Sequence, residues 1–184
     1  PVRVTIDPPP AAVAGVQALL DVLRAADRSL SVAGALCFGA GAKDALRELT
    51  DATAIPVFTN GAGRGTLSMD HPHCFKAARG KALRAADVVL LIGTPLDFRL
   101  KYGREDWNPE GKLIQIENDA AELNHNRQAD VALVADARLV LEALAEGLQG
   151  IRFQPWLEQV AEWERARNEK QAAWEALDDT PVNH

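Results

Sequence analysis

Five short runs of mostly apolar residues, each ending at a glycine or a polar residue, constrain this chain more than any other feature. In the clearest run, five apolar residues occupy positions 88–92 and stop at Gly93. The others span residues 29–34, 55–58, 112–117 and 130–135. Because the apolar residues are continuous rather than alternating, we expect both faces of these strands to be buried. Helical segments alternate with them, which predicts an α/β fold with a doubly wound parallel sheet of five or six strands.

Helical spacing of apolar residues over 11–26 predicts the first helix, and further helices are expected near 39–51, 80–86 and 136–148. We therefore predict a Rossmann-like domain over residues 11–150, preceded by a linker over 1–10. Residues 151–184 are expected to form a connector helix and a further linker. The sequence starts without methionine and ends without a helix cap, so we expect a domain excised from a longer chain.

The segment 156–177 carries three of the four tryptophans. Trp156, Trp163 and Trp174 lie near one helical stripe together with Val160 and Leu177, and the opposite face is charged. Two interpretations stay open. The helix lies back across its own domain, or it connects to a following domain or a second subunit.

Composition excludes several partners. The net charge is −6 over 184 residues, which argues against nucleic acid and against anionic membranes. No apolar run reaches transmembrane length, and no export signal precedes the domain. The cysteines, Cys37 and Cys74, are expected to be ordinary thiols in a reducing cytoplasm, so we predict a cytoplasmic location.

Ligands of doubly wound sheets bind beyond the carboxyl ends of the strands. Glycines there allow close approach, an acidic residue accepts hydrogen bonds from ribose, and arginine clamps a diphosphate. The predicted cofactor-binding residues are Gly34, Thr59, Asn60, Gly61, Gly93, Thr94, Asp97, Arg99, Glu117, Asn118 and Asp136. Together they suggest an adenine-nucleotide site. The alternatives are that the glycines only make turns, and that Asp97 and Arg99 neutralise each other on the surface.

Other motifs are incomplete. "GAGAKD" has Asp44 in place of the third glycine of a dinucleotide fingerprint, and "GAGRG" lacks the lysine of a Walker loop. "DHPHC" offers His71, His73 and Cys74, but no second ligand pair follows at zinc-site spacing, so no metal site is predicted. We find no nucleophile or general base of the usual kind and predict no catalytic residue.

The order of segments resembles the central domain of thiamine diphosphate-dependent enzymes. The similarity is carried by "GAGAKDALRELTDATAIPVFTNGAGRGTLSMDHP", "ADVVLLIGTPLDFR" and "KLIQIENDAAELNHNRQADVALVADARLVLEAL", within about residues 10–150. The acetolactate synthase group is the most similar type, with oxalyl-CoA decarboxylase, 2-hydroxyacyl-CoA lyase and benzaldehyde lyase as relatives.

The resemblance implies a subunit of three domains, whose outer domains bind thiamine diphosphate and magnesium between paired subunits of a dimer or tetramer. No Gly-Asp-Gly metal motif occurs here, so this chain alone is expected neither to bind thiamine diphosphate nor to catalyse. In the family the central domain holds FAD, holds ADP or is empty. Two departures from the pattern of the FAD-binding relatives weaken FAD binding. Their glycine triplet after the first strand is here Ala33-Gly34-Ala35, and Pro95 stands where they have an arginine. Arg99 matches the second arginine of that pattern.

Two other functions stay open from the sequence. One is a stand-alone nucleotide-binding module with a sirtuin-like or transhydrogenase-like sheet, although the sirtuin zinc cysteines are absent. The other is an interaction domain that uses the tryptophan-rich helix.

Overall fold

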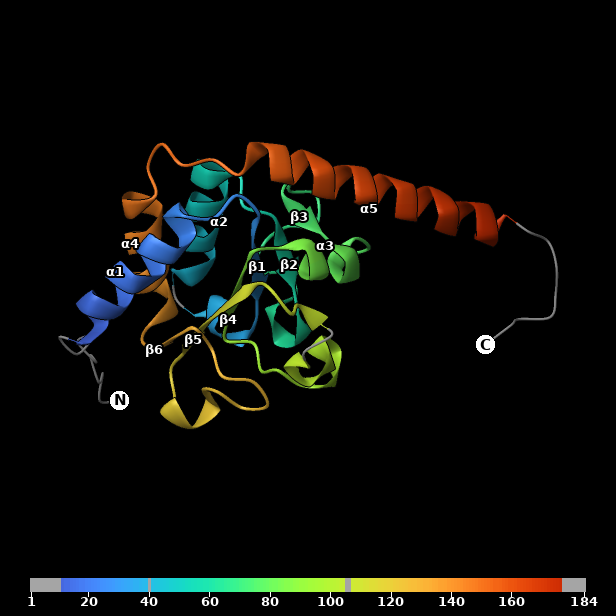
Figure 1. Ribbon diagram of the computed structural model, residues 1–184. Coiled ribbons are helices and arrows are strands. Elements are labelled where there is room, and N and C mark those ends of the chain that lie inside the picture. Colours follow the sequence, from blue (N-terminus) through green and yellow to red (C-terminus); the bar gives the residue numbers. More distant parts are fainter. Residues whose placement is uncertain (1–10, 40, 105–106, 177–184) are drawn as a thin grey trace, which may run out of the picture.

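A computed structural model describes residues 11–39, 41–104 and 107–176, and in it a six-stranded parallel sheet forms the centre of the molecule (Figure 1). The strand order is β3-β2-β1-β4-β5-β6, and every neighbouring pair is parallel. The expected doubly wound α/β fold is therefore confirmed. The strands are β1 (Ser29–Ala33), β2 (Val57–Thr59), β3 (Cys74–Phe75), β4 (Val88–Ile92), β5 (Lys112–Glu117) and β6 (Val131–Val134).

The helices follow the predicted apolar spacing closely. Helix α2 is capped at its amino end by Gly41 with a φ of +80°, and α4 is capped by the side chain of Asp136. Helices α2 and α4 pack on each other, and α1 packs on α4 and β6. Their bounds are α1 (Ala11–Arg24), α2 (Ala42–Thr53), α3 (Arg79–Ala85), α4 (Ala137–Gly147) and α5 (Gln154–Glu175). Short 3-10 turns η1 (Ala35–Phe38), η2 (Gly61–Gly63), η3 (Phe98–Gly103) and η5 (Ala120–Glu122) follow strand ends.

The sixth strand, β3, was expected to be part of a loop. It pairs with β2 through Val57–Cys74 and Phe58–Phe75, and it is only two residues long. A strand this short has no period that a sequence can display. Its cysteine, Cys74, is buried, and burial raises the pKa of the thiol to about 11.

The prediction that every strand is buried on both faces is right for β1 and β4 and wrong for β6. All residues of β1 and β4 are buried, whereas Ala132 and Val134 of β6 are exposed. Strand β6 is the edge strand of the sheet, and its alternating burial shows that one of its two faces is uncovered. Its apolar sequence gave no sign of this position.

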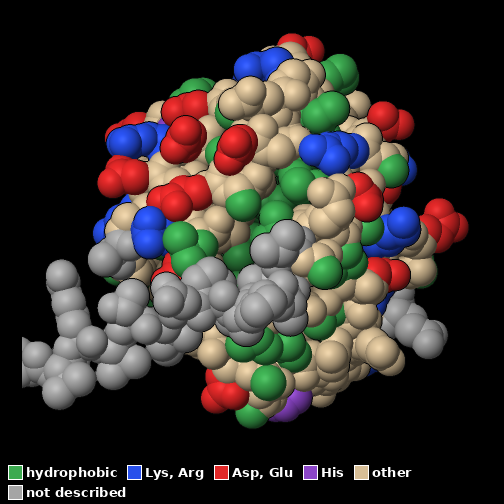
Figure 2. All heavy atoms as spheres, turned by 90° about the vertical axis from the view of Figure 1, so that its left-hand side faces the viewer, with side chains coloured by type: hydrophobic (Ala, Val, Ile, Leu, Met, Phe, Trp, Pro, Cys, Tyr) green, Lys and Arg blue, Asp and Glu red, His purple; other side chains and the backbone are tan. Residues whose placement is uncertain are grey.

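The face that carries α1 in Figure 1 is turned to the viewer in Figure 2. Acidic side chains gather in the upper part of this face, and hydrophobic side chains lie in its centre and lower part. This agrees with the net charge of −6. Within the described residues, no helix has the length and apolar character needed to cross a membrane.

Helix α5 packs on the domain over its first half and projects beyond it over its second half (Figure 1). Trp156, Leu157 and Val160 are buried, and Trp156 meets Trp163 edge-to-face with ring centroids 5.5 Å apart. Residues 165–175 are all exposed, including Trp174 at 69%. The packed half agrees with a helix that lies back on its own domain. Leu177 lies outside the described residues.

Glu164 fixes the point at which α5 leaves the domain. Its carboxylate accepts hydrogen bonds from the backbone amides of Lys76, Ala77 and Ala78, with the shortest, from Ala78, at 2.7 Å. These amides lie between β3 and α3, where a helix start leaves donors without partners. Lys81 adds a cation–π contact, its Nζ lying 4.2 Å from the centroid of the Trp163 ring.

We predict that Glu164→Ala lowers the free energy of unfolding by about 2–3 kcal/mol, because partly buried amides lose a charged acceptor. Glu162→Ala is the matched control, since Glu162 is exposed on the same helix and, among the residues that the structure describes, accepts a hydrogen bond only from the Gln159 side chain. Its effect should stay within about 0.5 kcal/mol. Urea denaturation measures both, and equal effects of the two variants would contradict the anchoring role.

Candidate functional site

The centre of the site is the point at which β1 and β4 part at their carboxyl ends. The chain leaves β1 toward β2 and leaves β4 toward β5, so the loops turn in opposite directions. Gly34 and Gly93 follow these strands, and their backbones touch closely. A Cβ atom on Gly34 would lie 2.0 Å from the Gly93 carbonyl oxygen, and Gly93 has a φ of +58°. Both positions therefore require glycine.

The backbone amides around this point are used by the protein itself. The amide of Gly34 donates to the Ile92 carbonyl at 2.8 Å, that of Ala35 to Gly93 at 2.9 Å, and that of Gly93 to Ile116 at 2.9 Å. The hydrogen bonds extend the sheet by one residue past each strand. These glycines therefore hold the loops together, and their amides are not offered to a phosphate.

Thr94 and Glu117 lie buried beside the glycines. The Thr94 hydroxyl lies 3.2 Å from the carbonyl oxygen of Val32 and 3.3 Å from that of Ile92. Burial and, second, the nearby carboxylate of Glu122 raise the pKa of Glu117 to about 7, against the opposing effect of the Thr94 backbone amide. Glu117 is thus a carboxyl group that changes charge near neutral pH.

A cleft of about 230 Å³ opens at the ends of β1, β5 and β6. It brings together Asn118 and Asp136 of the predicted set, with Ala35, Leu36 and Gly39 of the β1 loop. Asp136 accepts from the amides of Arg138 and Leu139 through Oδ1, which leaves Oδ2 for a ligand.

Arg138 lines the same cleft and was missed from the sequence. It lies in the first turn of α4, beside the helix cap, and its Nη1 donates to Glu142 Oε1 at 3.0 Å. The only feature of the sequence that could have pointed to Arg138 as a site residue is its position two residues after Asp136, which follows a strand.

The other predicted residues lie elsewhere. Asp97 and Arg99 form an ion pair with each other, and Asp97 also caps η3. This agrees with the alternative of mutual neutralisation on the surface. Thr59 ends β2 and is followed by Asn60 and Gly61, and the Asn60 side chain lies 3.4 Å from Arg79. The eleven residues therefore do not form one pocket.

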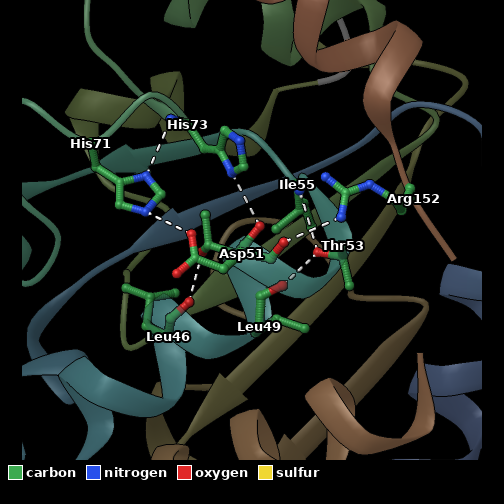
Figure 3. A network of polar contacts seen from close by, with 9 residues as sticks. Leu46, Leu49, Asp51, Thr53, Ile55, His71, His73 and Arg152 are labelled. Carbon is green, nitrogen blue, oxygen red and sulfur yellow. Dashed lines mark hydrogen bonds and ion pairs between the residues drawn. The ribbon is translucent and has the colours of Figure 1, made fainter. Parts of the chain in front are cut away.

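Two of the three "DHPHC" side chains lie together with an aspartate, as Figure 3 shows. Ligand atoms of Asp51, His71 and His73 lie within 4.8 Å of one another. The amide of His73 donates to His71 Nδ1, so His71 carries its proton on Nε2, which faces Asp51 at 3.0 Å. Burial lowers the pKa of His73, although the Thr50 carbonyl, which faces His73 Nδ1 at 3.1 Å, acts in the opposite direction. Arg152 lies nearby (Figure 3). These contacts link the loop before β3 to helix α2.

The sequence matches the family model described as "Thiamine pyrophosphate enzyme, central domain" over residues 16–144. This chain belongs to the thiamine pyrophosphate enzyme family, as a central domain. The matched region runs from α1 into α4 and contains all six strands of the sheet.

The central domain is similar to one segment of several longer proteins. It is 35% identical over 158 residues to an acetolactate synthase large subunit of Mycobacterium tuberculosis, covering 86% of this chain and 28% of that protein. It is 32% identical over 175 residues to 2-hydroxyacyl-CoA lyase 1 of Mus musculus, covering 92% and 30%. It is 31% identical over 136 residues to oxalyl-CoA decarboxylase of Escherichia coli K12, covering 74% of this chain and 23% of that protein. The chain thus spans less than a third of the length of these relatives.

Of the cofactors that the family implies, a whole FAD does not fit the residues of this central domain. Pro95 offers neither a charge nor an amide donor, and Arg99 is held by Asp97. The cleft of about 230 Å³ is also smaller than most sites for drug-sized ligands. Asn118, Asp136 and Arg138 line this cleft together, and Asp136 uses Oδ1 for the backbone amides of α4.

We predict that Gly34→Ala destabilises the central domain by about 1–3 kcal/mol or more, because the added methyl group overlaps the Gly93 carbonyl. Gly80→Ala is the control, since a Cβ there meets nothing within 4 Å and Gly80 lies in α3. It should be neutral or stabilising by about 0.5–1 kcal/mol. Thermal and urea unfolding test the pair, and similar losses in both would argue against the close contact.

The pKa of Glu117 predicts a stability change with pH. Between its ordinary value of 4.5 and the folded value of about 7, the folded chain holds a proton that the unfolded chain has lost. Stability should therefore fall as pH rises through this window, by up to about 3 kcal/mol relative to Glu117→Gln. Unfolding curves at pH 4.5 to 8 measure the difference. Glu110→Gln, at an exposed loop position, should follow the wild type, whereas parallel profiles of wild type and Glu117→Gln would refute the prediction.

Proposed function

We propose that this chain is the central domain of a thiamine diphosphate-dependent carboligase or decarboxylase of the acetolactate synthase type. The family match and the similarity to acetolactate synthase, 2-hydroxyacyl-CoA lyase and oxalyl-CoA decarboxylase support this. In the parent enzyme, flanking domains would bind thiamine diphosphate and magnesium in a cytoplasmic dimer or tetramer. Thiamine diphosphate would supply the carbanion chemistry there. The residues of the central domain would take no part in that chemistry.

We further propose that the cleft at the ends of β1, β5 and β6 binds ADP. The observation that carries this proposal is that Asn118, Asp136 and Arg138 line one cleft, next to the point at which β1 and β4 part at their carboxyl ends. The oxygens of Asp136 and Asn118 would accept hydrogen bonds from ribose hydroxyls. The guanidinium of Arg138 would face the phosphates and would share its charge with Glu142.

The arrangement favours ADP over FAD for two reasons. Arg138 supplies a cationic partner for the phosphates of ADP at this edge. FAD would extend along the η3 loop, where Pro95 and the Asp97–Arg99 pair give no clamp. The η3 loop would then serve as scaffold.

Calorimetric titration of the chain with ADP, FAD and NAD tests the proposal. ADP should bind more tightly than FAD or NAD, and Arg138→Ala should weaken ADP binding about 10-fold or more, because a charged hydrogen bond is lost. Arg47→Ala is the matched control, since Arg47 also pairs with an acidic side chain on its own helix but lies outside the cleft. Absence of ADP binding, or equal effects of the two variants, would refute a nucleotide site here.

The alternative of a stand-alone module makes a different prediction for the same titration. Tight NAD binding with weak FAD binding would favour it. The coding sequence on either side of this segment separates the two proposals as well, because a parent enzyme requires a downstream Gly-Asp-Gly metal motif.

A further inference from the structure

A second pocket lies between the projecting half of α5 and the edge of the sheet at β2 and β3. Its volume is about 760 Å³, within the range of small-molecule sites. Thr59 and Arg64 line it from the β2 side, Lys76 and Arg79 line it after β3, and Arg167 and Glu175 line it from α5. We refer to it as the α5 groove.

The α5 groove gathers positive charge on a chain that is acidic overall. Four cationic side chains line it, those of Arg64, Lys76, Arg79 and Arg167, against the single carboxylate of Glu175. The whole chain has a net charge of −6. The excess of cations is therefore a local property of the groove.

None of the four cations has an ion-pair partner among the residues that the structure describes. Arg79 is half-buried, and its one hydrogen bond goes to the neutral Asn60 side chain at 3.4 Å. Burial, and secondly the charge of Arg64, lowers the pKa of Arg79. Two arginines that repel each other in a partly dry pocket are stabilised by an anion between them.

The nearby carboxylate of Glu164 does not serve as that anion. It is occupied by the amides of residues 76–78, which also take up the donors before α3. The groove thus retains its cations on three separate elements, with a fork-shaped guanidinium on each: Arg64 on the β2 loop, Arg79 on α3 and Arg167 on α5.

We propose that the α5 groove binds the phosphate groups of a phosphorylated small molecule. Guanidinium groups match phosphate oxygens in pairs, and several cations around one pocket require a ligand with more than one negative charge. The site is separate from the cleft at Asn118, Asp136 and Arg138, and the proposal does not depend on nucleotide binding there.

Inorganic pyrophosphate is the probe, titrated calorimetrically into the full chain at low salt. Arg64→Ala and Arg167→Ala should each weaken binding about 10-fold, and since both residues are exposed, folding should be unaffected. Arg165→Ala is the matched control, because Arg165 is exposed on the same helix but does not line the groove, and it should bind as the wild type does.

Arg138→Ala separates this proposal from the nucleotide cleft. It should leave pyrophosphate binding unchanged even if it abolishes ADP binding. Three results would overturn the proposal: no pyrophosphate binding, equal weakening by Arg165→Ala, or loss of pyrophosphate binding in Arg138→Ala. Equally tight binding of citrate would overturn the assignment to phosphate.

Discussion

The close backbone contact between Gly34 and Gly93 is the constraint on which the rest of the structure depends. The two central strands can part at their carboxyl ends only because no side chain stands between the Gly34 backbone and the Gly93 carbonyl. Hydrogen bonds then continue the sheet past both strands, and the loops diverge toward β2 and β5. The cleft at Asn118, Asp136 and Arg138 is lined on one side by the loop that follows β1. A side chain at Gly34 or Gly93 would displace that loop and with it one wall of the cleft.

The fold could be predicted from the sequence because its signals are local and repeated. The residues of β1 and β4 are buried throughout, as a parallel sheet requires, and their apolar runs are continuous. Burial of β6 could not be predicted in the same way, since an edge strand and a central strand can have the same composition. β3 was missed because two residues carry no periodicity.

The candidate site was predicted less well, because strand order does not say how far each loop extends. Asn118 and Asp136 meet in one cleft, whereas Arg99 pairs with Asp97 and Thr59 lines a different pocket. Arg138 and Arg79 have no motif that marks them. Their positions in the pockets depend on neighbours distant in sequence: Gly41 packs against Arg138, and Asn60 accepts a hydrogen bond from Arg79. Only the three-dimensional arrangement reveals such pairs.

The anchoring of α5 at Glu164 turns its last eleven residues, 165–175, into a rod that points away from the sheet. At 1.5 Å per residue the tip stands about 16 Å from the anchor. A tilt of about 10° at Glu164 would sweep the tip through roughly 3 Å. The three amides before α3 are the last contacts that Glu164 makes with the domain, so a small disturbance there would be magnified at the far end of the helix.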